Sequence, residues 1–186
     1  MSHAISPSMS LEEFLVWEEA QEREWEFDGF HPVAMVGVSD AHSAIQMNLA
    51  AALVTRLRGS RCRPRSDLKV LIGSKIRYPD ALVSCTAIAP TATVAAEPVV
   101  VFEVLSKSTA RTERTTKLPE YRSLESVQRY VLIEQDQAMA TSYSRTDRGW
   151  VVHQFLIADI LPLPEIGIEI PVSELYADVE LPEDEA

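Results

Sequence analysis

Two short apolar segments of this chain each carry a single acidic residue, and this combination limits the folds it can adopt. Residues 76–84 contain Asp80, and residues 99–105 contain Glu103. Continuous runs rich in β-branched residues, bounded by turn residues, predict strands that are buried on both faces. A carboxylate in such a strand loses its hydration, so it needs a proton, a cation or hydrogen bonds to remain there.

On neighbouring strands, Asp80 and Glu103 would lie within reach of one divalent ion, which prefers carboxylate oxygens, a carbonyl and water. Lys117 follows Glu103 by fourteen residues, in a polar segment that the sequence predicts to be helical. Two acids on a strand pair, followed by a lysine on the next helix, are typical of metal-dependent phosphodiesterases. In a purely structural role, Asp80 would cap the turn after Pro79, and Glu103 would pair with an arginine.

The length of 186 residues and a hydrophobic content of 46% predict one globular domain. We expect a flexible N-terminus at residues 1–9, the domain at 10–176 and an acidic C-terminal tail at 177–186. No apolar run is long enough to cross a membrane, and no signal-like start is visible. Cys62 and Cys85 are too few and too isolated for a disulfide framework or a zinc site, so we expect a cytoplasmic protein.

The net charge of −11 is unfavourable for contact with nucleic-acid phosphates, which relies on lysine and arginine. Much of the acidity, however, lies near the two ends of the chain, in residues 11–28 and in the tail. Basic residues gather from 107 to 117 and in an earlier group that comprises Arg56, Arg58, Arg61, Arg63, Arg65, Lys69, Lys75 and Arg77. The sequence therefore allows a local basic face on an acidic protein.

Periodicity and turn residues predict the order of the elements. Ser10 and Glu13 form a capping box at the start of a helix, and Asp28-Gly29 marks the turn of a hairpin. His42 lies in the first turn of the second helix, where it could contact a phosphate or a metal, although such a histidine is more often structural. We expect helices at 11–23, 41–58, 106–124 and 172–176, with Pro119 breaking, kinking or restarting the third. Strands are expected at 25–31, 32–38, 76–84, 99–105, 127–134, 139–144, 150–157 and 166–170, and residues 62–72 should form a strand pair or one long bent strand.

The order of these elements and their motifs resembles the restriction-endonuclease-like superfamily, whose signature is Pro-Asp, a spacer, then an acid, any residue and lysine. More narrowly, residues 10–176 resemble the Uma-type endonucleases of bacteria. The matching motifs are Trp25-Glu26-Phe27-Asp28-Gly29, Asp40-Ala41-His42, Ser66-Asp67-Leu68, Tyr78-Pro79-Asp80, Phe102-Glu103-Val104-Leu105-Ser106, Lys117-Leu118-Pro119-Glu120-Tyr121-Arg122 and Tyr130-Val131-Leu132-Ile133.

This resemblance implies an α/β (α+β) fold of the restriction-endonuclease-like type, with a central mixed β-sheet flanked by helices and an N-terminal helix and hairpin. One position departs from the superfamily signature, because Leu105 stands where lysine is expected. In the Uma-type endonucleases that lysine lies on the following helix, and the match here is Lys117. The same family carries a glutamate near the first hairpin, which matches Glu26; a solvated strand residue is the alternative interpretation for this side chain.

The implied activity is that of a metal-dependent DNA endonuclease that forms a homodimer. Asp80 and Glu103 would bind Mg²⁺ or Mn²⁺, with the carbonyl of Val104 as a further ligand. Lys117 would hold the scissile phosphate or activate the attacking water, and Glu26 would bind a second metal or orient water. Lys69 and Lys107 are the competing candidates for the lysine of the site.

A second interpretation is a catalytically silent domain of the same fold that acts as an accessory or self-associating protein. The net charge of −11 and Leu105 favour this alternative, whereas the set of Asp80, Glu103 and Lys117 favours the nuclease. For self-association, the segment 150–157 is the candidate edge strand.

Overall fold

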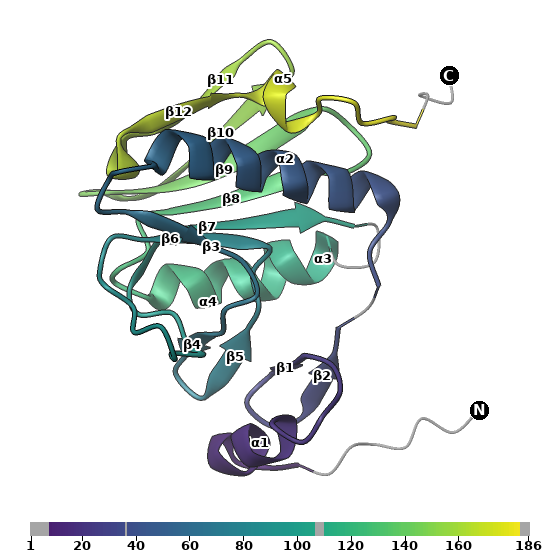
Figure 1. Cartoon of the computed structure of the whole chain (residues 1–186), viewed down its shortest axis with the longest axis vertical. Coiled ribbons are helices and arrows are strands. Elements are labelled where there is room, and N and C mark those ends of the chain that lie inside the picture. The colour runs from purple at the N-terminus through teal and green to yellow at the C-terminus, as the bar shows by residue number, and fades with distance from the viewer. Residues whose placement is uncertain (1–7, 36, 107–109, 183–186) are drawn as a thin grey trace.

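A six-stranded mixed sheet forms the centre of the computed structural model, which describes residues 8–35, 37–106 and 110–182 (Figure 1). Its strand order is β10-β9-β8-β7-β6-β3. Only β7 and β8 are parallel within this sheet, and the other neighbouring pairs are antiparallel. The strands are β3 (Arg63–Arg65), β6 (Ala81–Ser84), β7 (Pro98–Leu105), β8 (Arg129–Glu134), β9 (Met139–Thr146) and β10 (Gly149–Leu156).

Helices cover both faces of this sheet, which explains why its central strands β7 and β8 are mainly apolar. Helix α2 (Asp40–Leu57) packs on one face against Val100, Phe102 and Val104 of β7. The other face carries the crossover between β7 and β8, which consists of α3 (Ala110–Thr112), the π-helical turn η1 (Glu113–Lys117) and α4 (Leu118–Ser123). Because side chains alternate along a strand, Glu103 points to the crossover side together with its neighbours Val101 and Leu105.

A second, four-stranded sheet joins the N-terminal part of the chain to this body. Its order is β2-β1-β5-β4, and the strands are β1 (Trp25–Phe27), β2 (Pro32–Ala34), β4 (Val70–Ile72) and β5 (Lys75–Arg77). Helix α1 (Leu11–Glu18) packs on it through a small core of Phe14, Phe27, Ile76 and Tyr78. Figure 1 shows α1, β1 and β2 below the main sheet, connected to α2 by one extended segment.

The C-terminal elements complete the α2 side of the core. Strands β11 (Ile160–Leu163) and β12 (Ile168–Pro171) pair with each other, separated by the 3-10 turn η2 (Pro164–Ile166) and followed by α5 (Val172–Leu175). Beyond α5, the carbonyl of Ala177 accepts a hydrogen bond from Asn48 on α2 (2.9 Å). Within the described part of the chain, no helix is long and apolar enough to cross a membrane.

The structure confirms the expected mixed sheet, the flanking helices and the N-terminal helix and hairpin, but it changes several boundaries. The first helix ends at Glu18 instead of residue 23, and β11 was not expected. The predicted strand 76–84 is two strands in different sheets, β5 and β6, separated by Tyr78-Pro79-Asp80. Proline has no N–H to donate to a sheet, so the chain leaves one sheet before Pro79 and joins the other after it.

Of the three outcomes expected at Pro119, the structure is nearest to a restart: Pro119 lies in the first turn of α4, which follows the π-helical turn without an intervening loop. Proline lacks the N–H that an α-helix would use at this point. The turn before it is widened to a π-helix, in which the Leu118 N–H donates to the carbonyl of Glu113, five residues earlier. This widened turn buries both Glu113 and Lys117.

The two cysteines form a disulfide, contrary to the expectation that they are isolated. Arg63 on β3 is paired with Ser84 on β6, so the residues that flank this pair, Cys62 and Cys85, meet at the end of the two strands. A sequence separation of 23 residues hides this proximity, which depends on the register of the strands. Because the two cysteines form a disulfide, their small number no longer supports a cytoplasmic location.

Candidate active site

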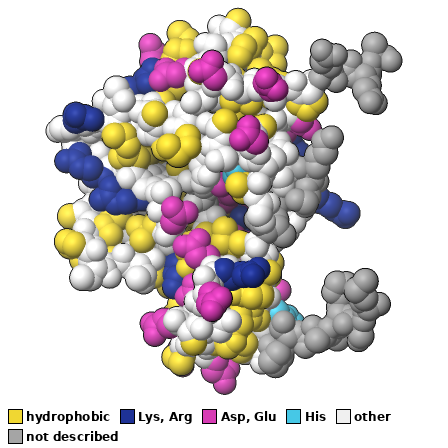
Figure 2. Space-filling view, turned by 45° about the vertical axis from the view of Figure 1, so that its right-hand side comes forward, with side chains coloured by type: hydrophobic (Ala, Val, Ile, Leu, Met, Phe, Trp, Pro, Cys, Tyr) yellow, Lys and Arg dark blue, Asp and Glu magenta, His cyan; other side chains and the backbone are white. Residues whose placement is uncertain are grey.

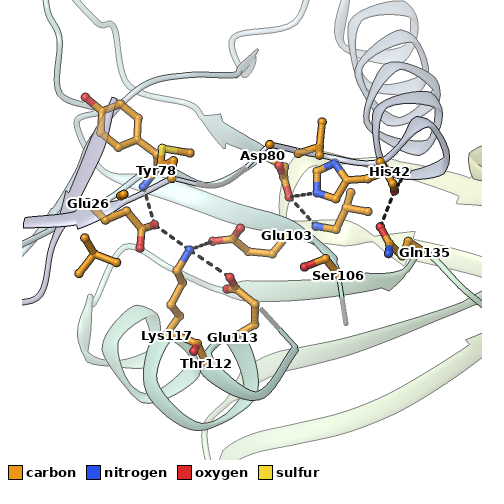
Figure 3. Close-up of a pocket in the computed structure, with 17 residues that line it drawn as sticks. Glu26, His42, Tyr78, Asp80, Glu103, Ser106, Thr112, Glu113, Lys117 and Gln135 are labelled. Carbon is orange, nitrogen blue, oxygen red and sulfur yellow. Dashed lines mark hydrogen bonds and ion pairs between the residues drawn. The ribbon is translucent and has the colours of Figure 1, made fainter. Parts of the chain in front are cut away.

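Asp80 and Glu103 lie opposite each other at the ends of neighbouring strands. Ala81 of β6 pairs with Phe102 of β7, so Asp80, the residue just before β6, lies next to Glu103 at this end of the strand pair. Both side chains line one cavity of about 520 Å³ between the main sheet and the N-terminal elements (Figure 3). The expectation that the two acids come from adjacent strands agrees with this geometry.

Lys117 reaches this cavity from the crossover helix and contacts three carboxylates. Its Nζ lies 2.7 Å from Oε1 of Glu26, 3.1 Å from Oε1 of Glu113 and 3.3 Å from Oε1 of Glu103. Figure 3 shows these acids converging on the ammonium from β1, the π-helical turn and β7. The lysine side chain is only 7% exposed, so these contacts replace nearly all of its hydration.

Lys69, one of the two competing lysines, is paired elsewhere in the structure. Lys69 forms an ion pair with Glu18 of α1, and the same glutamate accepts a hydrogen bond from the Tyr78 hydroxyl (2.6 Å). Lys107 lies outside the described residues. Of the lysines that can be compared, Lys117 is therefore the one placed against Glu103.

Glu26 is buried rather than solvated, so the alternative interpretation of this side chain is wrong. Its Oε1 accepts a hydrogen bond from the Tyr78 N–H (3.3 Å), and its Oε2 accepts one from Nη1 of Arg77 (3.3 Å). Arg77 also forms a buried ion pair with Glu120 of α4, in which its Nε lies 2.7 Å from Oε2. These bonds connect the N-terminal hairpin to the crossover helix.

Glu113 is the site residue that the sequence interpretation missed. It is buried, its Oε2 accepts a hydrogen bond from the Tyr130 hydroxyl (3.2 Å), and it lies four residues before Lys117. That spacing typically joins an acid and a lysine on one helix face. The signal was present in the sequence, but the polar segment 106–117 gave no reason to expect a buried face.

Asp80 belongs to the other half of the cavity, where it faces α2. Its Oδ2 accepts a hydrogen bond from the Val104 N–H (2.6 Å) and lies 3.6 Å from Nε2 of His42. Nε2 of Gln46 lies 3.4 Å from its Oδ1. The Nδ1 atom of His42 is buried without a hydrogen-bond partner, which leaves one polar atom of the cavity wall unsatisfied.

Two buried carboxyl groups of the site, those of Glu103 and Glu113, have raised pKa values. Loss of hydration raises the pKa of Glu103 well above its ordinary value, and the charges of Glu113, Asp80 and Glu26 add to this effect, although Lys117 opposes it. Burial likewise raises the pKa of Glu113. For Lys117, burial favours the neutral amine, but the surrounding carboxylates outweigh it and raise its pKa above the ordinary value. The lysine therefore remains charged, and Glu103 and Glu113 hold a proton more readily than exposed carboxyl groups do.

The donor atoms of the cavity fit a hard divalent cation. Asp80 and Glu103 supply carboxylate oxygens. Val104, which would offer its backbone carbonyl, and Ser106 also line the cavity. Among the described residues, no group of three or more His, Cys, Asp and Glu side chains is arranged to hold a metal. Mg²⁺ does not need such a cage, because it commonly binds one or two carboxylates and keeps several waters.

The mixed sheet, its parallel β7–β8 pair and the acids at the strand ends define a fold of the restriction-endonuclease-like class. The crystal structure of "a putative nuclease belonging to DUF820" from Anabaena variabilis matches the chain with a TM-score of 0.75. The match covers 91% of this chain and 98% of that one at 19% sequence identity. At this identity the likeness shows the fold alone.

The family follows from the sequence. The family model described as "Uma2: Putative restriction endonuclease" matches residues 11–173. The chain is also 33% identical over 175 residues to the uncharacterized protein slr1290 of Synechocystis, covering 91% of this chain and 92% of that protein. The chain therefore belongs to the Uma2 family, and the resemblance carried by the sequence motifs is confirmed.

The raised pKa of Glu103 predicts how its substitution changes the pH dependence of stability. A carboxyl with a higher pKa in the folded than in the unfolded protein stabilises the fold at low pH, and this stabilisation is lost as pH rises through the folded pKa. In EDTA, we expect the free energy of unfolding of Glu103→Gln to increase relative to wild type as pH rises above about 4.5, the ordinary value.

Urea denaturation across this pH range measures the difference. Glu125→Gln is the matched control, because Glu125 is exposed and away from the cavity, and its difference from wild type should stay constant with pH. A pH-independent difference for Glu103→Gln would show that the carboxyl is not held in a desolvated site.

Proposed function

We propose that this protein is a metal-dependent endonuclease that hydrolyses phosphodiester bonds of DNA. The observation that carries the proposal is the convergence of Asp80, Glu103, Lys117 and Glu26 on one cavity from four separate parts of the chain. Buried carboxylates outnumber the single lysine among them, and such an excess of negative charge favours binding of a divalent cation. Membership of the Uma2 family supports the nuclease class.

In this proposal Asp80, Glu103 and the carbonyl of Val104 hold Mg²⁺ or Mn²⁺. The bound ion would polarise the phosphodiester and lower the pKa of a water molecule. His42 and Gln46 hold the Asp80 carboxylate toward α2, and the Val104 N–H fixes the oxygen that would otherwise be free to rotate. Two carboxylates of different elements are thereby kept at the mouth of one cavity.

Lys117 supplies the positive charge that the reacting phosphate requires. Its ammonium stays protonated among the acids, so it can hold a phosphate oxygen as negative charge develops there. Glu26 and Glu113 position this ammonium, since they approach it from opposite sides at 2.7 and 3.1 Å. Glu26 can also orient water in the cavity through its remaining lone pairs.

Plasmid nicking tests the activity. With Mg²⁺ or Mn²⁺, wild-type protein should convert supercoiled plasmid to the open circle, and Asp80→Asn and Lys117→Met should each reduce the rate by at least about a hundredfold, the scale of losing a group that stabilises developing charge. Glu125→Gln, on the surface, should retain the wild-type rate. Nicking that persists in Asp80→Asn would assign the activity to a contaminant or to another site.

Thermal unfolding tests the metal separately from the chemistry. An ion that binds only the folded protein adds about 2.7 kcal/mol at a hundredfold excess over its Kd. For a domain of this size, that corresponds to a rise in Tm of about 5–10 °C. Asp80→Asn should abolish the rise while leaving the Tm in EDTA unchanged or higher, because one of the crowded charges is removed. A wild-type melting curve that millimolar Mg²⁺ and Mn²⁺ leave unmoved contradicts the metal site and favours the silent domain.

We further propose a homodimer, formed by antiparallel pairing of β10 with β10 of a second copy. This eight-residue strand is an edge of the main sheet and has no charged residue. The Leu156 N–H donates to the Asp159 carboxylate, and the Leu156 carbonyl accepts from the Asp159 N–H. The backbone groups of Leu156 therefore face away from β9. Because this direction alternates along a strand, those of Trp150, Val152 and Gln154 also face away from β9. If Val152 of one copy lies opposite Val152 of the other, these backbone groups bond to one another across a two-fold axis.

The two edges of the main sheet differ in a way that supports this assembly. At the opposite edge, Arg63-Pro64-Arg65 of β3 carries charges and a proline that disfavour further pairing. On β10, the apolar side chains Val152 and Leu156 are 55% and 57% exposed. Two copies of a protein with a net charge of −11 repel each other least where the surface is neutral.

Light scattering during size-exclusion chromatography measures the assembly. Wild-type protein at micromolar concentration should have the mass of a dimer, and Val152→Lys should have that of a monomer, because a charge would face the same charge across the symmetry axis. Val16→Lys places the same charge on an exposed apolar position of α1 and should remain a dimer. A monomeric wild type would remove the proposed assembly.

A further inference from the structure

The arginines of this acidic chain are strongly segregated. Between Asp40 and Asp67 the sequence carries five arginines and no acidic residue, although the chain as a whole has a net charge of −11. Arg56 is neutralised by Glu174, whose oxygens lie 2.6 and 2.9 Å from its guanidinium. The remaining four, which we call the arginine edge, are Arg58, Arg61, Arg63 and Arg65.

Each residue of the arginine edge is exposed, and none of the four has an acidic partner among the described residues. Arg63 and Arg65 donate only to backbone carbonyls of their own segment, the latter to Pro64 (2.7 Å). Both belong to β3, where side chains two residues apart share a face. Figure 2 shows Lys and Arg side chains gathered on the left of the body, the end of the main sheet where Figure 1 places the connection from α2 to β3.

A groove connects this edge to the candidate active site. Arg65 pairs with Leu82 of β6, which is two residues beyond Asp80 and therefore about 7 Å along the strand from it. A second cavity, of about 290 Å³, lies between α2 and β3 and is lined by both Arg65 and Asp80. Asp80 thus stands where the active-site cavity and this groove meet.

The groove is mainly apolar and shares Arg65 with the arginine edge; its other charged lining residues are Asp67 and Asp80. On the α2 side it is lined by Met47 and Val54, which are 67% and 48% exposed. On the β3 side it is lined by Pro64 and Arg65. A polynucleotide strand has the matching chemistry, since its phosphates are anionic and its bases offer apolar faces.

We propose that the arginine edge binds phosphates of the nucleic-acid strand whose scissile bond lies at Asp80. The inference rests on the proposed nuclease function and adds to it the path by which the strand leaves the active site, past the groove between α2 and β3 and over the outer edge of β3, where Arg63 and Arg65 share the sheet face of Ser84 and Leu82. Protection of an exposed sheet edge accounts for Arg63, Pro64 and Arg65. It does not account for Arg58 and Arg61, which lie outside the strand, or for the groove.

Binding of a fluorescein-labelled DNA oligonucleotide, followed by anisotropy in EDTA at several salt concentrations, tests the path without requiring cleavage. Arg63→Gln combined with Arg65→Gln should weaken binding on the order of tenfold and reduce the slope of log Kd against log salt by about 2, one for each lost phosphate contact. Arg58→Gln combined with Arg61→Gln should also weaken binding and reduce the slope. Because these two residues lie outside β3, this variant tests the path even if substitutions in β3 destabilise the fold.

Two comparisons make the test specific. Arg23→Gln with Arg148→Gln removes the same charge at exposed positions away from the groove and should change neither the affinity nor the slope. Asp67→Asn removes an acid that lines the groove and should strengthen binding. If the control pair weakens binding as much as the edge pairs, the interaction follows net charge, and the proposed path is wrong.

The outcome separates this inference from the proposed function. If the wild type nicks plasmid but the variants of the arginine edge bind DNA as tightly as the wild type, the path is wrong and the proposed nuclease function stands. Binding that depends on the arginine edge, in a protein that nicks no plasmid, supports the path and overturns the catalysis. A wild type without measurable DNA affinity in EDTA overturns the path and leaves the catalysis to the nicking assay.

Discussion

The buried ammonium of Lys117 is the interaction on which the arrangement around the cavity depends. Removing a lysine and its partners from water costs several kcal/mol per ion, and only close pairing offsets this cost. Here the partners come from β1, β7 and the π-helical turn, so no single element could hold the charge alone. The ion cluster therefore joins the N-terminal hairpin, the main sheet and the crossover helix. A second buried pair, Arg77 with Glu120, joins β5 to α4 on the same side.

The same cluster links stability to chemistry. Three carboxylates around one lysine leave the cavity with negative charge that its own residues do not balance, and Asp80 adds to it from the α2 side. A protein interior tolerates such an excess only by binding protons or cations, as the raised pKa values of Glu103 and Glu113 indicate. The groups suited to phosphodiester chemistry are thus those that destabilise the fold when nothing is bound.

The sequence predicted the parts of this site that follow from strand burial, and missed those that follow from local backbone geometry. Asp80 and Glu103 were found because each interrupts an apolar run, and Lys117 because the family motif extends to the next helix. Glu113 and the disulfide of Cys62 with Cys85 were missed, since one depends on a widened helical turn and the other on strand register. The division of the strand at Pro79 was missed because both halves are apolar.

The π-helical turn has a consequence for the tolerance of this family to insertions and deletions. Each residue of an α-helix turns the chain by about 100°, and a π-turn accommodates one more residue than an α-turn at the same place. Loss of one residue between Glu113 and Lys117 would restore regular α-helix and preserve the length of the crossover, and the two side chains would still share a helix face at a spacing of three residues. The π-helical turn can therefore gain or lose one residue without separating the acid from the lysine, so this short crossover carries its own allowance for a change in length.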